Sequence, residues 1–261
     1  MKALHIAATG MLAQQLNVEV ISNNIANLRT TGYKRQRAEF QDLLYQDIRR
    51  VGANSSETGT LLPAGIQIGL GVRTASTYRV MTQGDLQGTE KSLDIAIRGD
   101  GLFQVDLPDG RTAYTRAGAF ELNADGSLVT QDGFEVQPGI TIPSDAREVA
   151  INAQGQVEVF TSTSTSSTIV GQLELARFVH QAGLEAIGDS MFVETPASGS
   201  PTTGTPGSTG FGTLLQKYLE GSNVNAVSEI SDLIAAQRAY EMNAKVISAA
   251  DEMMSATSNM R

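Results

Sequence analysis

The sequence predicts an α+β protein in which long N- and C-terminal helices pair as a coiled coil, with a central all-β domain of short antiparallel strands. Two observations support this prediction. Apolar residues recur every seven positions near both ends of the chain, and alternating apolar residues separated by Asp-Gly pairs fill the middle. We expect a terminal helical domain from 1–44 and 212–261, an extended linker with β segments at 45–92, a β-domain at 93–197, and a Gly/Pro/Ser/Thr-rich linker at 198–211.

The N-terminal helix is predicted to run from Met1 into the asparagine-rich stretch Ser22-Asn23-Asn24-Ile25-Ala26-Asn27-Leu28. Gly32 is expected to end it and to turn the chain. One stripe of this helix is apolar, interrupted by Gln14, and its members are spaced as in a coiled-coil seam. They are Leu4, Ala7, Met11, Val18, Ile21, Ile25 and Leu28.

The C-terminal helix repeats the same spacing, and Ser222 or Asn225 is placed to cap its start. Its stripe consists of Ala226, Leu233, Ala236, Tyr240, Ile247, Ala250, Met254 and Thr257. Ordering a residue costs roughly 1–2 kcal/mol of backbone entropy, and only about two residues in seven lie on such a stripe. We therefore expect both helices to be marginal in a monomer and to become ordered when several stripes are buried together.

The asparagines near the apolar stripe have a separate predicted role. Asn17 and Asn24 lie seven positions apart beside the stripe, and Asn27 follows one turn later. Side-chain amides both donate and accept hydrogen bonds, at a smaller desolvation cost than charges. We expect them to fix the register where helices of different subunits meet.

The composition excludes several classes of function. The chain has 261 residues with a net charge of −9, which argues against nucleic-acid binding. Its basic cluster, Arg29, Lys34, Arg35 and Arg37, is expected to be a solvated or inter-subunit face. Cysteine is absent, which removes disulfides, thiolate catalysis and cysteine-ligated metals. We expect no membrane insertion and no cleaved signal peptide, because no apolar stretch is long enough for a membrane span and only Lys2 precedes the first apolar run.

The middle of the chain has the pattern of a β-sheet. Asp-Gly recurs at 100–101, 109–110, 125–126 and 132–133 between short apolar runs, which favours a meander of hairpins. Strands are expected around Ile66–Leu70, Ile95–Ile97, Val149–Ile151, Val157–Phe160, Leu173–Phe178 and Met191–Glu194, whereas 73–81 could belong to the linker or to the sheet. Two low-complexity stretches, at 161–168 and 198–207, are interpreted as surface loops or linkers.

Two short motifs have chemical interpretations that we weighed against plain turns. Asn123-Ala124-Asp125-Gly126 resembles part of a calcium loop, but Asp132 stands where a glutamate is usual and no helices flank it, so we expect a hairpin turn. Gly188-Asp189-Ser190-Met191 resembles the serine-nucleophile block of one esterase group. The sequence offers only His5 and His180 as bases for Ser190, so we expect a turn, no catalytic residue and no cofactor.

Several stretches together resemble the bacterial flagellar rod and hook family of axial proteins. At the N-terminus these are 23–28 and Thr31-Gly32-Tyr33-Lys34, and at the C-terminus 219–225 and 236–241. Gly99-Asp100-Gly101-Leu102-Phe103 and 114–120 are similar to the shared central β-domain, with Leu102 where a second phenylalanine is common. The segment from Tyr45 to Gly69 looks like the insertion that distinguishes distal-rod members from hook and proximal-rod members.

The resemblance implies a structural function. Such subunits are exported unfolded, without a cleaved signal peptide, through the flagellar type III pathway, and polymerise into a rigid hollow helical drive shaft that transmits torque across the periplasm. The implied partners are copies of itself, proximal rod proteins, the hook protein, the outer-envelope ring proteins, the rod cap and the export apparatus. The residues expected at subunit interfaces are Leu4, Met11, Val18, Ile21, Asn24, Ile25, Asn27, Leu233, Tyr240, Ile247 and Met254. The residues expected to stiffen the rod are Arg49, Asn54, Ser55, Ser56 and Leu62.

Three alternatives remain at the level of sequence. The helix stripes could form an ordinary intramolecular hairpin. The chain could be a proximal rod or hook-type axial subunit. The third alternative, a serine esterase using Ser190, predicts an activity that Ser190→Ala abolishes.

Overall fold

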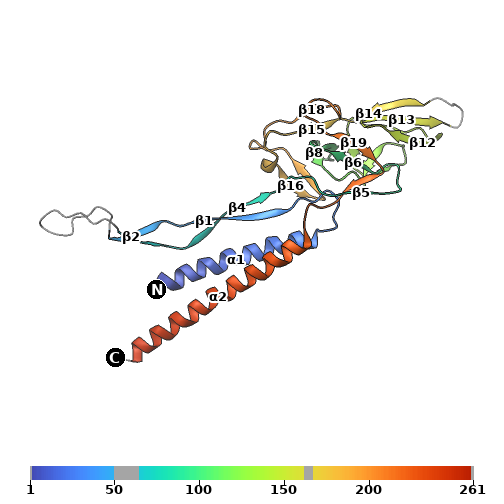
Figure 1. The fold of residues 1–261 in the computed structure, drawn as a ribbon. Helices are drawn as coiled ribbons and strands as arrows, with labels where there is room; N and C mark the ends of the chain where they lie inside the picture. The colour runs from blue at the N-terminus through green and yellow to red at the C-terminus, as the bar shows by residue number, and fades with distance from the viewer. Residues whose placement is uncertain (1, 50–64, 162–166, 260–261) are drawn as a thin grey trace. The chain divides into compact units, whose positions relative to one another are not determined.

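A computed structural model describes residues 2–49, 65–161 and 167–259 of the chain (Figure 1). The chain divides into two compact units. Unit 1 comprises Met1–Ile25, Gln36–Tyr78 and Ala226–Arg261, and unit 2 comprises Ala26–Arg35 and Arg79–Asn225. Both units therefore combine segments that are far apart in the sequence, and the chain passes from one unit to the other at four points.

Unit 1 contains the two long helices and four strands. Helix α1 spans Lys2–Ala26 and α2 spans Ala226–Asn259. Strand β1 (Gln36–Asp42) pairs with β4 (Val72–Arg79), and β2 (Tyr45–Arg49) pairs antiparallel with β3 (Ile66–Gly69). The α+β class is confirmed. However, α1 ends at Ala26, before Gly32, and β1 forms within 1–44, the range that the sequence assigned to the terminal helical domain.

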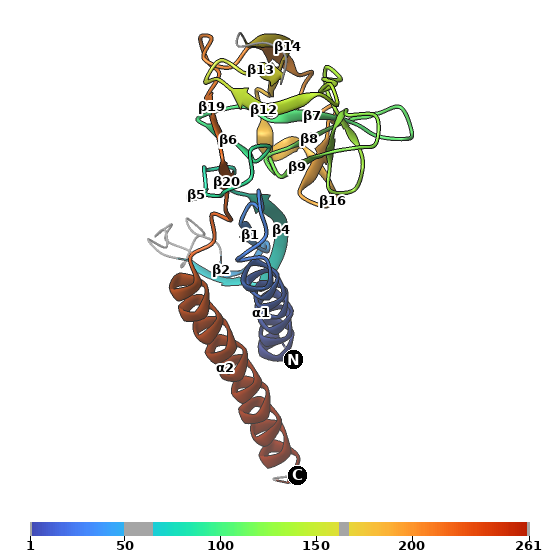
Figure 2. The same cartoon turned by 90° about the vertical axis from the view of Figure 1, so that its right-hand side faces the viewer.

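The predicted coiled-coil pairing of the terminal helices is wrong. In unit 1, α1 and α2 lie alongside each other (Figures 1 and 2) and run antiparallel, with Asn24 bonded to Glu229 and Gly10 close to Asn243. A coiled coil requires the large side chains of both stripes to interlock along the helices. Instead, an open groove of about 640 Å³ separates the helices where Leu4 faces α2.

The burial along α2 gives the physical reason. The stripe residues that the structure buries are the small Ala236 and Ala250, whereas Tyr240 and Met254 are 44% and 38% exposed. Alanine side chains cannot fill the holes of a facing helix. The seven-residue repeat therefore predicts which face of α2 points toward α1, but not an interlocked seam.

Unit 2 is mainly antiparallel β-structure. Its largest sheet has seven strands in the order β16-β17-β8-β7-β11-β10-β9, a second sheet has the order β12-β13-β14, and the pairs β15-β18, β19-β6 and β20-β5 complete the unit (Figure 2). A short 3-10 helix, η1, spans Gln181–Gly183. The strands are β5 Leu86–Gly88, β6 Ile95–Arg98, β7 Phe103–Asp106, β8 Thr112–Thr115, β9 Phe120–Leu122, β10 Leu128–Thr130, β11 Glu135–Val136, β12 Ala146–Ile151, β13 Gln156–Thr161, β14 Thr168–Gln172, β15 Leu175–Arg177, β16 Glu185–Gly188, β17 Met191–Val193, β18 Thr202–Gly204, β19 Thr213–Gln216 and β20 Tyr218–Glu220.

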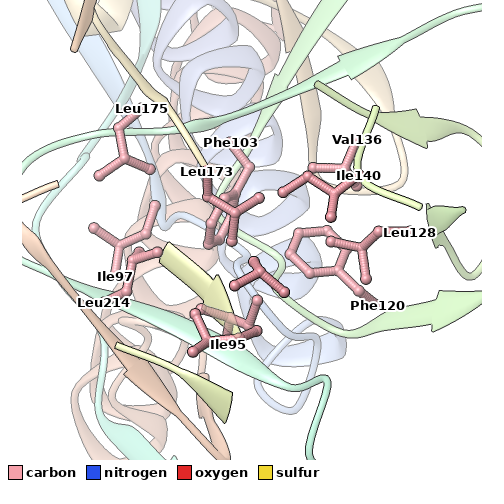
Figure 3. Close-up of a cluster of buried hydrophobic side chains, with 12 residues drawn as sticks. Ile95, Ile97, Phe103, Phe120, Leu128, Val136, Ile140, Leu173, Leu175 and Leu214 are labelled. Carbon is pink, nitrogen blue, oxygen red and sulfur yellow. The ribbon is translucent and has the colours of Figure 1, made fainter. Parts of the chain in front are cut away.

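Both faces of the seven-stranded sheet are covered by apolar side chains. Side chains of successive residues point to opposite faces, so Leu102 and Phe103 belong to different clusters. The cluster in Figure 3 includes Phe103, whose ring meets that of Phe120 edge-on with 5.0 Å between centroids. It also contains Ile95, Ile97, Leu128, Val136, Ile140, Leu173, Leu175 and Leu214. The second cluster packs Tyr114 against Phe178 and Phe192.

Three of the four Asp-Gly pairs lie in hairpin turns, as predicted, and all four glycines have positive φ. Those at 109–110, 125–126 and 132–133 join neighbouring antiparallel strands, whereas Asp100-Gly101 connects β6 to β7, which belong to different sheets. Segment 73–81, whose place the sequence left open, supplies most of β4. Strand β18 forms inside the stretch predicted as a linker at 198–211.

Neither α1 nor α2, the two α-helices of the described residues, combines the length and apolar character needed to cross a membrane. Within the same described part of the chain, no group of three or more His, Asp or Glu side chains is arranged to hold a metal ion.

Candidate functional site

The most unusual chemistry of unit 2 is a buried charged cluster around Glu220. Glu220 ends β20 and is fully buried, Lys34 follows α1 in the sequence and is 2% exposed, and Arg116 follows β8 and is 6% exposed. One carboxylate oxygen of Glu220 accepts from Lys34 Nζ at 2.5 Å and from the Gly84 N–H at 3.0 Å. The other accepts from Arg116 Nε at 2.8 Å, with Arg116 Nη2 at 2.7 Å. We call Lys34, Arg116 and Glu220 the ion cluster.

Backbone geometry brings Lys34 to this position. Gly32 has φ +69°, and a Cβ added there would lie 2.6 Å from the backbone nitrogen of Ala117. Only glycine allows this segment to lie so close to the residues after β8. The Gly32 N–H also donates to the Glu220 carbonyl at 2.8 Å, so both the backbone and the side chain of Glu220 hold the segment that ends at Lys34.

Arg116 uses its remaining donors on the backbone of the preceding loop. Nη1 donates to the carbonyls of Gly99 at 2.8 Å and Gly101 at 2.7 Å, and Nη2 donates to Ile97 at 3.3 Å. Both glycines have positive φ, which lets their carbonyls converge on the guanidinium. The planar, many-donor group of arginine is suited to this arrangement, and lysine could not replace it.

Asn223 joins the same segments a few residues beyond the ion cluster. Its amide nitrogen donates to the carbonyls of Val80 at 2.9 Å and Thr82 at 3.0 Å, while its oxygen accepts from the Arg35 N–H at 2.7 Å. Val80 in turn donates its N–H to the Arg35 carbonyl at 2.8 Å. Within unit 2, three of the segments that lead to or from unit 1 are thus bonded to one another.

The ion cluster carries one excess positive charge, because two cations share one carboxylate. Burial lowers the pKa of the Lys34 ammonium below its ordinary value, attraction to Glu220 opposes that shift, and repulsion by Arg116 adds to it. A buried cation that lost its partner would be strongly unfavourable. The cluster is therefore a structural joint that depends on Glu220.

Unit 1 has a comparable joint around Asn24. The Asn24 amide donates to the Gln36 carbonyl at 2.8 Å and its oxygen accepts from the Gln36 N–H at 2.9 Å, as a neighbouring strand would. The same amide nitrogen donates to the buried Glu229 carboxylate at 3.1 Å. In the isolated chain, Asn24 therefore ties α1, β1 and α2 together.

The other residues predicted at subunit interfaces lie on α1, just beyond it, or on α2. Ile21 is buried, and Tyr240 and Met254 are exposed. The remaining ones are partly buried: Leu4, Met11, Val18, Ile25, Asn27, Leu233 and Ile247. Of the predicted stiffening residues, Arg49 is exposed at the end of β2, whereas Asn54, Ser55, Ser56 and Leu62 lie outside the described residues.

Ser190 lies in a tight turn between β16 and β17, as the turn interpretation predicted. Asp189 and Ser190 have φ 51° and 56°, typical of the two central residues of a type I′ turn. The Ser190 hydroxyl donates to the Thr31 carbonyl at 3.0 Å, and the Ser190 carbonyl accepts from the Thr115 hydroxyl at 2.9 Å. The serine proton is thus committed to a backbone oxygen, and the side chain has a structural use.

Sequence reasoning missed the ion cluster. The sequence predicted that Lys34 lies on a solvated or inter-subunit face with Arg29, Arg35 and Arg37. This prediction is wrong for Lys34, which is buried, whereas Arg29 and Arg37 are exposed. A signal was present: Lys34, Arg116, Glu220 and Asn223 each stand in a stretch that carries the family resemblance. Charged residues in such stretches are candidates for buried pairs.

Known proteins are similar to this chain along its whole length. Residues 4–34 match the flagella basal body rod protein family, residues 96–159 the flagellar hook protein FlgE/F/G D1 domain, and residues 215–260 the flagellar basal body rod FlgEFG protein C-terminal family. Flagellar basal-body rod protein FlgG of Caulobacter vibrioides is 58% identical over 100% of both chains. FlgG of Agrobacterium fabrum is 55% identical over 99% of this chain and 98% of its own.

A solved structure of the flagellar hook protein FlgE2 from Helicobacter pylori is more distant. It has 15% sequence identity and a TM-score of 0.25, and the match covers 71% of this chain and 43% of that one. The assignment rests instead on the full-length identity to the two rod proteins, which extends over both helices and over the stretches that contain the ion cluster. By that identity, the chain belongs to the family of flagellar basal-body rod proteins.

Proposed function

We propose that this chain polymerises into the distal part of the flagellar rod, as a rigid hollow helical shaft that transmits torque to the hook and conducts exported proteins. The observation that carries the proposal is identity of 58% over the complete length of a FlgG protein, because a matching length includes the helices, the β-unit and the segment between β2 and β3. As a member of the rod protein family, the chain is a structural subunit of the flagellar basal body.

The surface of unit 1 supports polymerisation. Helix α2 exposes a series of large apolar side chains, among them Val227 at 76% and Met253 at 64%. Contiguous exposed apolar surface marks interaction sites in soluble proteins. The others on α2 are Ile230, Ile234, Tyr240, Met242, Val246 and Met254. We propose that these are buried between copies of the chain, together with the predicted interface residues that the isolated chain leaves at least partly exposed, which excludes Ile21 and Asn24.

The proposed partners follow from the position of a rod in the basal body. They are other copies of the chain, proximal rod proteins, the hook protein, the outer-envelope ring proteins, the rod cap and the flagellar type III export apparatus. We further propose that the chain reaches the rod without cleavage of a signal peptide. Immunogold labelling of isolated basal bodies tests the axial position, and labelling confined to the hook or the proximal rod contradicts it.

Sedimentation of the full chain tests polymerisation. We expect concentration-dependent assembly that is lost when both terminal helices are removed. In the full chain, Ile234→Glu should prevent assembly by placing a charge among the exposed apolar side chains of α2, whereas Gln154→Glu adds the same charge at an exposed polar turn residue of unit 2, outside the terminal helices, and should not. Equal behaviour of the two variants, or no assembly of the unaltered chain at high concentration, contradicts the proposal.

A second experiment concerns the segment between β2 and β3. We propose that deleting residues 49–62 leaves both units folded but makes the polymer bendable, since the resemblance links this segment to rod straightness. Electron microscopy of assembled filaments measures their curvature. Straight, stiff filaments from the deletion variant contradict a stiffening role.

A further inference from the structure

The β-structure of unit 2 is completed by strands from the far end of its sequence. Strand β19 pairs with β6, with Leu214 opposite Ile97, and β20 pairs with β5, with Glu220 opposite Leu86. The separation is large: Gly84 and the Glu220 carboxylate that it contacts are 136 residues apart along the chain. By contrast, β7-β8, β9-β10 and β10-β11 are hairpins of neighbouring strands.

The core around β6 depends on β19. Ile95 and Ile97 have no exposed surface, and Leu214 packs with them in the cluster of Figure 3. In the described part of the chain, β19 is also the one strand paired with β6. Removing β19 from this position would expose two isoleucines and leave the β6 backbone groups without their ladder bonds.

Gln216, at the end of β19, connects the same segment to β12. Its amide nitrogen donates to the carbonyls of Ser92 at 2.7 Å and Val149 at 2.8 Å, and its oxygen accepts from the Ile151 N–H at 3.0 Å. Until Gln216 is in place, the Val149 carbonyl and the Ile151 N–H of the edge strand β12, and the Ser92 carbonyl before β6, lack the partner that the folded unit provides. One side chain thus joins segments of unit 2 that share no other strand pairing with β19.

The ion cluster makes the burial of Lys34 and Arg116 depend on Glu220. Lys34 and Arg116 are both buried and share the carboxylate of Glu220. Two buried cations without that carboxylate repel each other and lose their main compensation for desolvation. Lys34 and Arg116 therefore cannot settle into their final positions before Glu220 arrives.

We propose that residues 213–224 form a closing strap: unit 2 first forms its local hairpins and stays open at β5 and β6 until the strap docks, with Glu220 as its anchor. Distant segments must overcome the entropy of loop closure before their contacts stabilise the chain, so they join after local hairpins. If the chain passes N-terminus first through the export apparatus named under the proposed function, unit 2 cannot lock before residue 220 has emerged. The order of folding itself does not rest on the proposed function.

Refolding of the unaltered full chain tests the order directly. The denatured chain is diluted into refolding buffer at a concentration too low for assembly, and amides are pulse-labelled by hydrogen exchange and read by mass spectrometry. We expect peptides covering β7–β11 to gain protection in an earlier phase than peptides covering β6 and β19. Simultaneous protection of all these strands, or earlier protection of β6 and β19, overturns the proposal.

A matched pair of substitutions tests the same order kinetically. Leu214 and Leu128 are both 2% exposed, the first in the strap and the second in a local hairpin. Truncating a buried leucine to alanine reduces the folding equilibrium constant by about 30-fold to about 5,000-fold. We expect Leu214→Ala to unfold faster, with a folding rate within about threefold of that of the unaltered chain. We expect Leu128→Ala to fold at least about fivefold more slowly than the unaltered chain.

The opposite result, with Leu214→Ala slowing folding more than Leu128→Ala, overturns the proposal. If either variant fails to fold, the pulse-labelling experiment on the unaltered chain still decides. Neither experiment involves filament assembly, so failure of the closing order is distinguishable from failure of the proposed rod function.

Discussion

Replacing Glu220 with glutamine tests the ion cluster as the joint of unit 2. The substitution keeps the shape of the side chain and one acceptor oxygen but removes the charge that Lys34 and Arg116 share. The new amide group would also direct N–H donors toward one of the two cations. Breaking a buried charged pair by removing one partner typically costs about 3–5 kcal/mol.

The part of the loss that falls on Lys34 has an upper limit. With its partner gone, Lys34 can lose its proton and stay buried as a neutral amine. Moving the ammonium pKa from its ordinary 10.5 down to neutral pH costs about 1.36 kcal/mol per pH unit, about 5 kcal/mol in all. We therefore expect Glu220→Gln to lower the free energy of unfolding by about 3–5 kcal/mol, a large part of the about 5–15 kcal/mol typical of a domain.

Urea denaturation of the full chain, followed by tyrosine fluorescence, measures this loss. With a urea dependence of about 2 kcal/mol per M, the midpoint should fall by about 1.5–2.5 M. The control is Glu121→Gln, the same substitution at an exposed ion pair with Lys91 at 3.6 Å, where we expect a change below about 1 kcal/mol. Adding Lys34→Met to Glu220→Gln should recover part of the loss by removing the excess cation. Equal effects of Glu220→Gln and Glu121→Gln would refute the reasoning.

Three further predictions concern single residues of unit 2, and urea denaturation measures each. Because the folded-state pKa of Lys34 lies below its ordinary value of 10.5, the unfolded chain binds more protons than the folded chain just below that pH. The free energy of unfolding of the unaltered chain, relative to that of Lys34→Met, should therefore increase as the pH is raised toward 10.5, by at most about 1.36 kcal/mol per pH unit, and a decrease would contradict this sign. Gly32→Ala should lower the free energy of unfolding by more than about 2 kcal/mol, because the added Cβ would clash with the backbone of Ala117. Gly110→Ala, also at positive φ but in open space, should lower it by only about 1 kcal/mol, and similar losses would show that the close approach at Gly32 is unimportant. Ser190→Gly and Ser190→Ala both lose the hydroxyl bond, but glycine should be about 1 kcal/mol more stable at φ 56°, and a less stable glycine variant would argue against strain in this turn.

Local patterns predicted the elements of the fold well. The heptad spacing predicted both terminal helices, and the Asp-Gly pairs predicted turns, because helices and tight hairpins are decided by residues close together in the sequence. The end of α1 was less predictable. The helix ends at Ala26, before Gly32, and the Asn24 side chain holds the Gln36 backbone at the start of β1 beside its last turn, a contact that no local pattern encodes.

Sequence patterns gave wrong predictions where the outcome depends on the distances between secondary-structure elements. The stripes of α1 and α2 satisfy the spacing of a coiled coil, but the space between the helices and the small size of Ala236 and Ala250 leave a groove instead of a seam. Lys34 was misplaced for a related reason. A lysine in a basic cluster is usually solvated, and only a carboxylate from the other end of the chain makes its burial possible.

The sequence by itself determined the α+β class, the helices, the turns and, through its resemblance, the flagellar rod family. All of these depend on residue identity and on the spacing of residues that are close together in the chain. Only the tertiary structure decided how the helices meet and that Lys34, Arg116 and Glu220 form one cluster. The physical reason is that a buried charge is tolerable only where opposite charge and hydrogen-bond partners converge in space. That convergence depends on chain closure over more than 180 residues, as between Lys34 and Glu220, and not on any local pattern.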